Sequence, residues 1–84
     1  MKTEIPPKLF WATRRGMLEL DVLLGNFLEN CYLLLSPEDK HIFIELLSSS
    51  DPELFAWLIG KETPSNLKFI KIIEAIRQHA KSRI

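Results

Sequence analysis

Apolar residues recur every three or four positions along most of this chain, which is the spacing of one face of an α-helix. The longest such stripe predicts a helix from about Met17 to Leu35. Shorter stripes predict helices around residues 42–47, 54–58 and 69–80. The sequence has neither an alternating strand pattern nor an Asn-Gly or Asp-Gly hairpin turn, so every predicted element is helical.

Prolines and capping residues predict where these helices begin. Three sites place a side-chain oxygen suited to the N-cap before a proline suited to the first helical position: Ser36-Pro37, Asp51-Pro52 and Thr63-Pro64. Gly60 is expected to end the helix that starts after Asp51. A further short helix is expected after Pro6-Pro7, ending near Gly16.

The predicted fold is therefore all-α, a compact five-helix bundle with short connections. A chain of 84 residues has room for one hydrophobic core. We expect residues 1–84 to form a single helical domain.

The charge is balanced overall but uneven along the chain. Eleven basic and eleven acidic residues give a formal net charge of +0, which argues against a dedicated nucleic-acid-binding protein. Residues 64–84 nevertheless carry five basic groups and one acidic group. This basic helix fits a solvated outer face with cations near its C-terminus, which we favour, or an amphipathic contact to a membrane or nucleic acid.

Residues for catalysis or metal binding are scarce. Cys31 is the only cysteine, which excludes an internal disulfide and a Cys-rich zinc site, and its place in the apolar stripe predicts a small core residue. His41 and His79 fall on different predicted helices without metal-binding companions, so each is expected to be solvated or partly packed. Three glycines cannot supply a phosphate-binding loop. We predict no catalytic residues, no bound metal and no enzymatic activity.

The first residues contain no apolar signal segment, and no apolar run approaches the roughly 18 residues of a membrane span. We therefore expect no membrane insertion and a cytoplasmic location.

The run RRGMLELD, residues 14–21, joins the first two predicted helices. One interpretation is a helix junction, with cations ending one helix, Gly16 in the turn, acids beginning the next, and Arg15 paired with Glu19. Two arginines, a bare glycine backbone and two carboxylates beside Trp11 also fit a surface that another backbone approaches closely. The residues alone leave both interpretations open.

The segment from Arg15 to Glu19 resembles the RGxxE motif of the succinate dehydrogenase FAD-assembly factors, which are small flavinylation chaperones. The longer string RRGMLELDVLL, a helix holding Phe27 and Tyr32, and DPELFAWLIG at 51–60 resemble that family in the same order. The likeness covers roughly residues 10–60.

This resemblance implies a five-helix domain that is not an enzyme. It implies binding to the flavoprotein subunit of succinate dehydrogenase, and in bacteria also of fumarate reductase, to promote covalent attachment of FAD to a histidine there. FAD would be the partner's cofactor, with none bound stably here, and we expect a monomer. The partner-binding residues would be Arg15, Gly16 and Glu19, with Arg14, Met17 and Trp11 as neighbours.

Two other functions compete with this one. An antitoxin-like module or another helical protein-binding regulator would share the same shape. A nucleic-acid-binding domain would use the basic last helix, with an affinity that falls steeply with salt.

Overall fold

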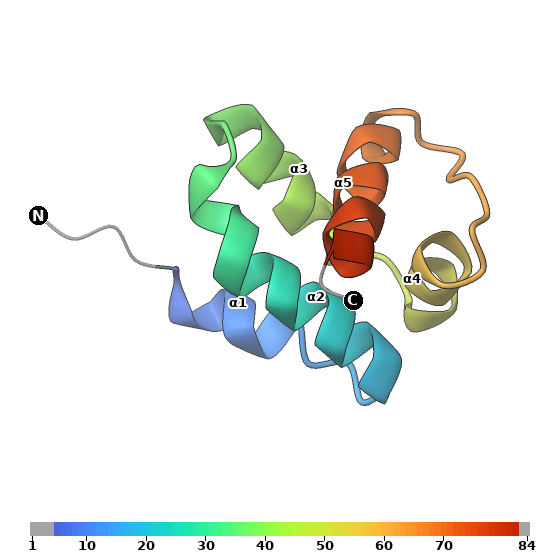
Figure 1. Ribbon diagram of the computed structural model, residues 1–84, viewed down its shortest axis with the longest axis horizontal. Helices are drawn as coiled ribbons and strands as arrows, with labels where there is room; N and C mark the ends of the chain where they lie inside the picture. The colour runs from blue at the N-terminus through green and yellow to red at the C-terminus, as the bar shows by residue number, and fades with distance from the viewer. Residues whose placement is uncertain (1–4, 83–84) are drawn as a thin grey trace, which may run out of the picture.

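The computed structural model describes residues 5–82, which fold into five α-helices and one short 3-10 helix without any strand (Figure 1). The prediction of an all-α, five-helix fold is confirmed. The elements are, in chain order, α1 (Pro7–Ala12), α2 (Leu18–Cys31), η1 (Tyr32–Leu34), α3 (Pro37–Leu46), α4 (Asp51–Leu58) and α5 (Lys68–Ser82).

Helix α5 is the central packing element. It contacts α2, α3 and α4, while α1 packs against the flank of α2 (Figure 1). Because α1 and α4 both contact α2, the turns that precede α2 and α4 come close to each other.

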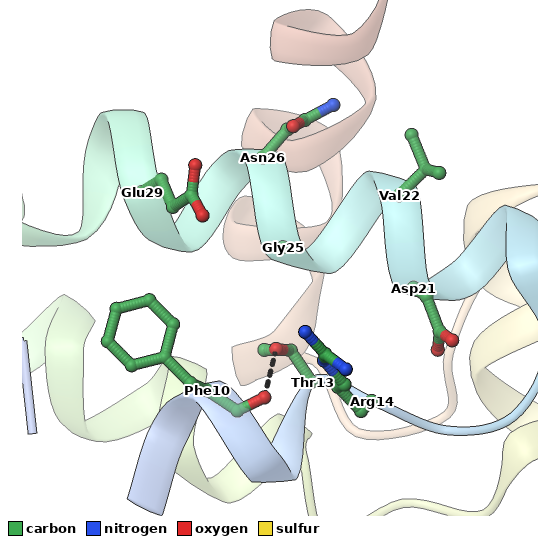
Figure 2. Close-up of a pocket in the computed structure, with 8 residues that line it drawn as sticks. All are labelled: Phe10, Thr13, Arg14, Asp21, Val22, Gly25, Asn26 and Glu29. Carbon is green, nitrogen blue, oxygen red and sulfur yellow. Dashed lines mark hydrogen bonds between the residues drawn. The ribbon is translucent and has the colours of Figure 1, made fainter. Parts of the chain in front are cut away.

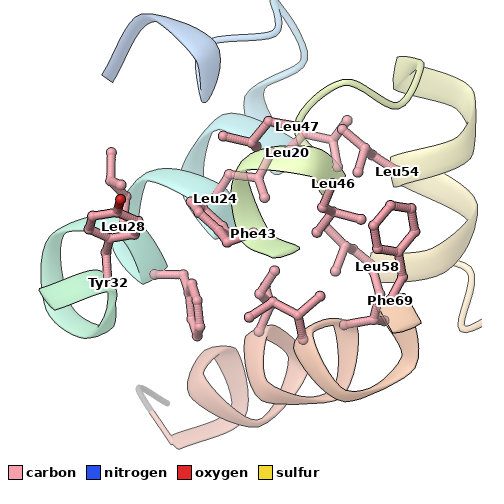
Figure 3. Packing of buried hydrophobic residues seen from close by; sticks show 14 of the residues in the cluster. Leu20, Leu24, Leu28, Tyr32, Phe43, Leu46, Leu47, Leu54, Leu58 and Phe69 are labelled. Carbon is pink, nitrogen blue, oxygen red and sulfur yellow. The ribbon is translucent and has the colours of Figure 1, made fainter. Parts of the chain in front are cut away.

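The core forms where the apolar stripes of these helices meet (Figure 3). The stripe of α2 supplies Leu20, Leu24 and Leu28, all with 0% of their surface exposed. Phe43 of α3 is also fully buried, and its ring lies 5.5 Å from that of Phe27. The leucine and isoleucine positions predicted from spacing are therefore the ones that hold the helices together.

A serine hydroxyl caps the N-terminus of both α3 and α4, but only the first of these caps is at the predicted residue. Ser36 caps α3 as predicted, because its side chain accepts the N–H of Asp39 at 3.1 Å. The prediction of Asp51 as the cap of α4 is wrong by one residue. Ser50 occupies the cap and forms a reciprocal capping box with Glu53, which satisfies two backbone N–H groups at once.

The predicted start of the last helix at Thr63 is wrong. Helix α5 begins at Lys68, after an irregular stretch in which the Pro64 ring is buried. Asn66 takes the capping role instead, since its side-chain oxygen accepts the N–H of Lys68 at 3.2 Å. A Thr-Pro pair thus marks a turn here because Ser65 and Asn66 bend the chain before the apolar stripe begins.

The helix ends also differ from expectation in detail. Helix α4 does stop before Gly60, but the left-handed residue is Lys61, with φ of 62°. Gly60 is suited to its place because a Cβ there would lie 2.9 Å from the carbonyl oxygen of Ala56. The long predicted helix to Leu35 ends at Cys31 and tightens into η1, which leaves Leu34 85% exposed.

Candidate partner-binding surface

The α1–α2 turn, residues 13–17, is fixed at both of its ends. The Thr13 side chain is buried, and its hydroxyl donates to the carbonyl of Phe10 at 3.0 Å. The backbone N–H of Arg15 donates to the carboxylate of Asp21 at 2.6 Å. Gly16 has φ of 87°, in the left-handed region that favours glycine. The turn therefore has one defined shape, and glycine is the residue that adopts it without strain.

The side chain of Arg15 points into the protein rather than toward solvent. Its Nε donates to Asp51 at 2.8 Å, and its Nη1 donates to the carbonyls of Leu47 at 2.8 Å and Ala12 at 3.1 Å. Its Nη2 donates to the carbonyl of Ser49 at 2.7 Å. Arg15 thus joins the α1–α2 turn to the α3–α4 turn, residues 47–50, with its side chain only 17% exposed.

The predicted pair between Arg15 and Glu19 is therefore wrong. The guanidinium finds a carboxylate at Asp51, on the neighbouring turn, together with carbonyl oxygens arranged around its planar fork. Glu19 lies in the first turn of α2, exposed, and without a hydrogen-bond or ion-pair partner among residues 5–82.

The other predicted site residues surround the turn at the surface. Arg14, Gly16 and Glu19 are exposed, and Trp11 is 74% exposed. Met17 is half-buried and packs against the core, so its side chain contributes to the stability of the fold. Arg14 and Gly16 lie in the turn itself, and Trp11 and Glu19 lie at the helix ends that flank it. The side chain of Arg15 points away from this group, into the protein.

Apolar neighbours of the turn were missed from the sequence. Leu18 is 78% exposed, and Phe10 and Val22 are also exposed. The exposure of two of them could have been predicted, because Leu18 and Val22 lie between the buried positions of the α2 stripe and therefore face away from the core. Exposed apolar groups of this size beside charged residues are typical of protein-binding surfaces.

A hollow of about 350 Å³ lies between α1 and α2, next to this turn (Figure 2). Phe10 and Arg14 lie on its α1 side, and Val22 and Glu29 lie on its α2 side. Gly25 faces it without a side chain, and a Cβ there would meet nothing within 4 Å. We call this hollow the α1–α2 groove.

The basic face of α5 is partly neutralised by α3. Lys68 Nζ lies 2.9 Å from a carboxylate oxygen of Glu45, and Lys71 Nζ lies 3.4 Å from one of Asp39. The hydrogen bond from Lys68 lowers the pKa of Glu45. These pairs agree with the solvated-face interpretation of the last helix.

Cys31 and His79 meet at the edge of the core. The thiol lies 3.6 Å from Nδ1 of His79, which packs edge-on to the ring of Phe27. Cys31, predicted to be a small core residue, is half-buried and packs against the core, and burial raises the pKa of its thiol. His79 is partly packed, in line with its prediction.

No group of three or more histidine, cysteine, aspartate and glutamate residues that is able to hold a metal occurs in residues 5–82. Across that same range, every helix is too short or too polar to cross a membrane.

In this all-helical chain an exposed indole and an exposed leucine lie beside charged side chains at one turn, a combination typical of protein-binding domains. Comparison with known proteins narrows this class. A family model described as "Flavinator of succinate dehydrogenase" matches residues 7–80. The chain belongs to this family, as the resemblance implied, and the family is named for assembly rather than catalysis, in agreement with the prediction that the chain is not an enzyme.

Individual relatives agree with the family model. The FAD assembly factor SdhE of Shewanella oneidensis is 50% identical over 70 residues, which cover 83% of this chain and 85% of that protein. The same factor from Coxiella burnetii is 48% identical over 71 residues, covering 84% of this chain and 87% of that one. The solution structure of a UPF0350 protein, 40% identical, superposes with a TM-score of 0.75 over 92% of this chain and 82% of its own.

Proposed function

We propose that this protein binds the flavoprotein subunit of succinate dehydrogenase, and also that of fumarate reductase, and promotes covalent attachment of FAD to it. The observation that carries the proposal is the α1–α2 turn, where Trp11, Leu18 and Glu19 are exposed around a fixed glycine backbone. The names of the relatives, FAD assembly factors, support the same assignment.

In this proposal the chain acts as a monomer in the cytoplasm, and FAD belongs to the partner. The flavin and the target histidine carry out their own chemistry, while this protein holds the flavoprotein in the conformer that lets them react. Preferential binding to one conformer raises its population by the difference in affinity, tenfold for each ~1.4 kcal/mol.

The residues around the turn divide between contact and support. Gly16 lets a partner backbone approach closely, because nothing lies within 4 Å of where a Cβ would be. Glu19 and Arg14 supply charge-assisted hydrogen bonds to the partner, and Trp11 supplies apolar area. Arg15 and Met17 hold the turn in place from inside, through the hydrogen bonds of Arg15 and the core packing of Met17.

The test is a reconstitution of the apo-flavoprotein subunit with FAD and this protein, read as covalent flavin fluorescence on a denaturing gel. Leu18→Ala and Glu19→Ala are expected to lower the rate of flavinylation at least tenfold. Leu67→Ala and Glu38→Ala are the matched controls, because Leu67 is 75% exposed and Glu38 is an exposed acid in the first turn of α3. Equal rates for the two pairs would remove the turn from the binding surface.

Gly16→Arg adds a steric test at the same place. The left-handed backbone costs any side chain there about 1–2 kcal/mol, so the variant is expected to fold with somewhat lower stability. Flavinylation should nevertheless be lost at temperatures where circular dichroism shows the variant fully helical. Full activity of this variant would show that the partner does not approach the turn.

A further inference from the structure

A second hollow, of about 490 Å³, lies between α2, α4 and α5 and plays no part in the proposed function. We call it the α5 groove. Its floor is apolar and is formed by Leu23, Leu58, Ile76 and Ala80. Leu23 follows Val22, which lines the α1–α2 groove, and a helix turns by about 100° per residue. The two grooves therefore open on different sides of α2.

The rim of the α5 groove is mostly cationic. Lys61, Arg77 and Lys81 line it, against the single carboxylate of Glu74. The two other described lysines of α5, Lys68 and Lys71, pair with acids of α3, so the excess positive charge of this helix is concentrated around the hollow.

Arg77 builds one wall of the groove. Its Nε donates to the carbonyl of Trp57 at 2.9 Å, and its Nη2 donates to the carbonyls of Trp57 and Glu62. These bonds fix the end of α4 and the following loop to α5. They leave Nη1 without a partner among residues 5–82, so one edge of the planar guanidinium still has N–H donors to offer.

Lys61 lines the groove from a strained position. Its φ of 62° makes it the non-glycine residue with left-handed backbone in the described part of the chain, and it directly follows a glycine that does not use that conformation. Glycine or asparagine would adopt this backbone with less strain. A lysine that keeps a left-handed backbone beside a hollow suggests that its positive charge takes part in binding there.

We propose that the α5 groove binds an acidic peptide segment of a protein partner, with an apolar side chain as anchor. The anchor rests on Leu23, Leu58 and Ile76, and the flanking carboxylates of the segment meet Lys61 and Lys81. A bilayer is the poorer fit, because anionic lipid binding needs an extended basic surface, whereas here the basic groups beyond the rim are paired and Glu74 lies on the rim.

The test is an NMR titration of the full chain with an acetylated pentapeptide that alternates glutamate and leucine. The backbone amides of residues 23, 61, 77, 78 and 81 are expected to shift together. Lys61→Glu and Lys81→Glu should each weaken binding at least fivefold, while Lys8→Glu, a charge reversal at an exposed lysine of α1, should change it less than twofold. Lys61→Gly removes the charge and relieves the backbone, so it should bind weakly in a protein that is at least as stable.

Four outcomes would overturn the proposal. A peptide with lysine in place of glutamate that shifts the same amides equally would remove the charge argument. The absence of shifts at millimolar peptide, or shifts confined to other residues, would remove the site. Shifts caused by decanoate or by phosphatidylglycerol vesicles, but not by the peptide, would assign the groove to lipid. Concentration-dependent shifts without peptide would assign it to a second copy. Because flavinylation is not measured, the result is independent of the proposed function.

Discussion

Replacing Arg15 with alanine is expected to destabilise the whole domain rather than only remove a surface charge. The substitution removes an ion pair with Asp51 and hydrogen bonds to three carbonyls, from a side chain that is 17% exposed. Hydrogen bonds of charged donors contribute about 1.5–3 kcal/mol each in favourable cases. Water can reach part of this site and replace some of them, so the net loss should be about 2–4 kcal/mol.

That loss is large for a chain of this size. Domains are stable by roughly 0.05–0.15 kcal/mol per residue, which for 84 residues is roughly 4–13 kcal/mol. Urea unfolding followed by circular dichroism measures the difference. Arg15→Lys should recover less than half of it, because one ammonium cannot reach carbonyls on both turns as the planar fork does.

Arg14→Ala is the matched control, since Arg14 is adjacent and exposed, and it should change stability by less than about 0.5 kcal/mol. An Arg15→Ala variant within about 0.5 kcal/mol of the wild type would refute the assignment of Arg15 as the link between the two turns. Flavinylation by these variants distinguishes a residue that stabilises the turn from one that contacts the partner. Lost flavinylation should return for Arg15→Ala when it is cooled until folded, and it should not return for Glu19→Ala.

Two further predictions concern stability and pH. Gly25→Ala should raise the free energy of unfolding by about 0.5–1 kcal/mol, because Gly25 lies within α2 with open space around it. Gly60→Ala should lower the free energy of unfolding, because its Cβ would contact the carbonyl of Ala56. Thermal unfolding of both variants checks these opposite signs. The pKa of Glu45 is lowered in the folded state, chiefly by the hydrogen bond from Lys68, so the ion pair supports folding above the ordinary carboxyl pKa and this support is lost as pH falls through the lowered value. A carboxyl NMR titration should show this depressed pKa, and in Lys68→Met it should return toward the ordinary value; an unchanged pKa would show that Lys68 does not cause the shift.

The fold was predictable where a local rule decides the structure. The stripe through Leu20, Leu24 and Leu28 needed only helical spacing, and these residues are fully buried. The Ser36 cap followed from a hydroxyl before a proline with acids in the next turn, whereas Thr63-Pro64, which lacks those acids, starts no helix. The cap of α4 was predicted wrongly because two adjacent residues are both suited to be the N-cap. Ser50 and Asp51 both suit an N-cap, and the reciprocal bond with Glu53 decides for Ser50.

The inward direction of Arg15 was beyond local rules. The carbonyls that it binds belong to Leu47 and Ser49, which are 32 and 34 positions away in sequence. No spacing within the RGxxE run contains that information. The exposure of Leu18 was visible as a departure from the stripe, but only the packing of α1 against α2 brings the exposed Phe10 to the same groove as Val22.

The tie between the two turns also orders the events of folding. The Arg15 guanidinium acquires its distant partners only when the chain has closed the loop that brings Leu47 and Ser49 to it. A chain with α1 and α2 formed but α3 and α4 undocked would leave this turn without its anchor. Hydrogen exchange at the Arg15 amide, which donates to Asp21, should therefore follow openings of the α3–α4 turn, and a nascent chain with that turn undocked would not present the surface in its folded shape.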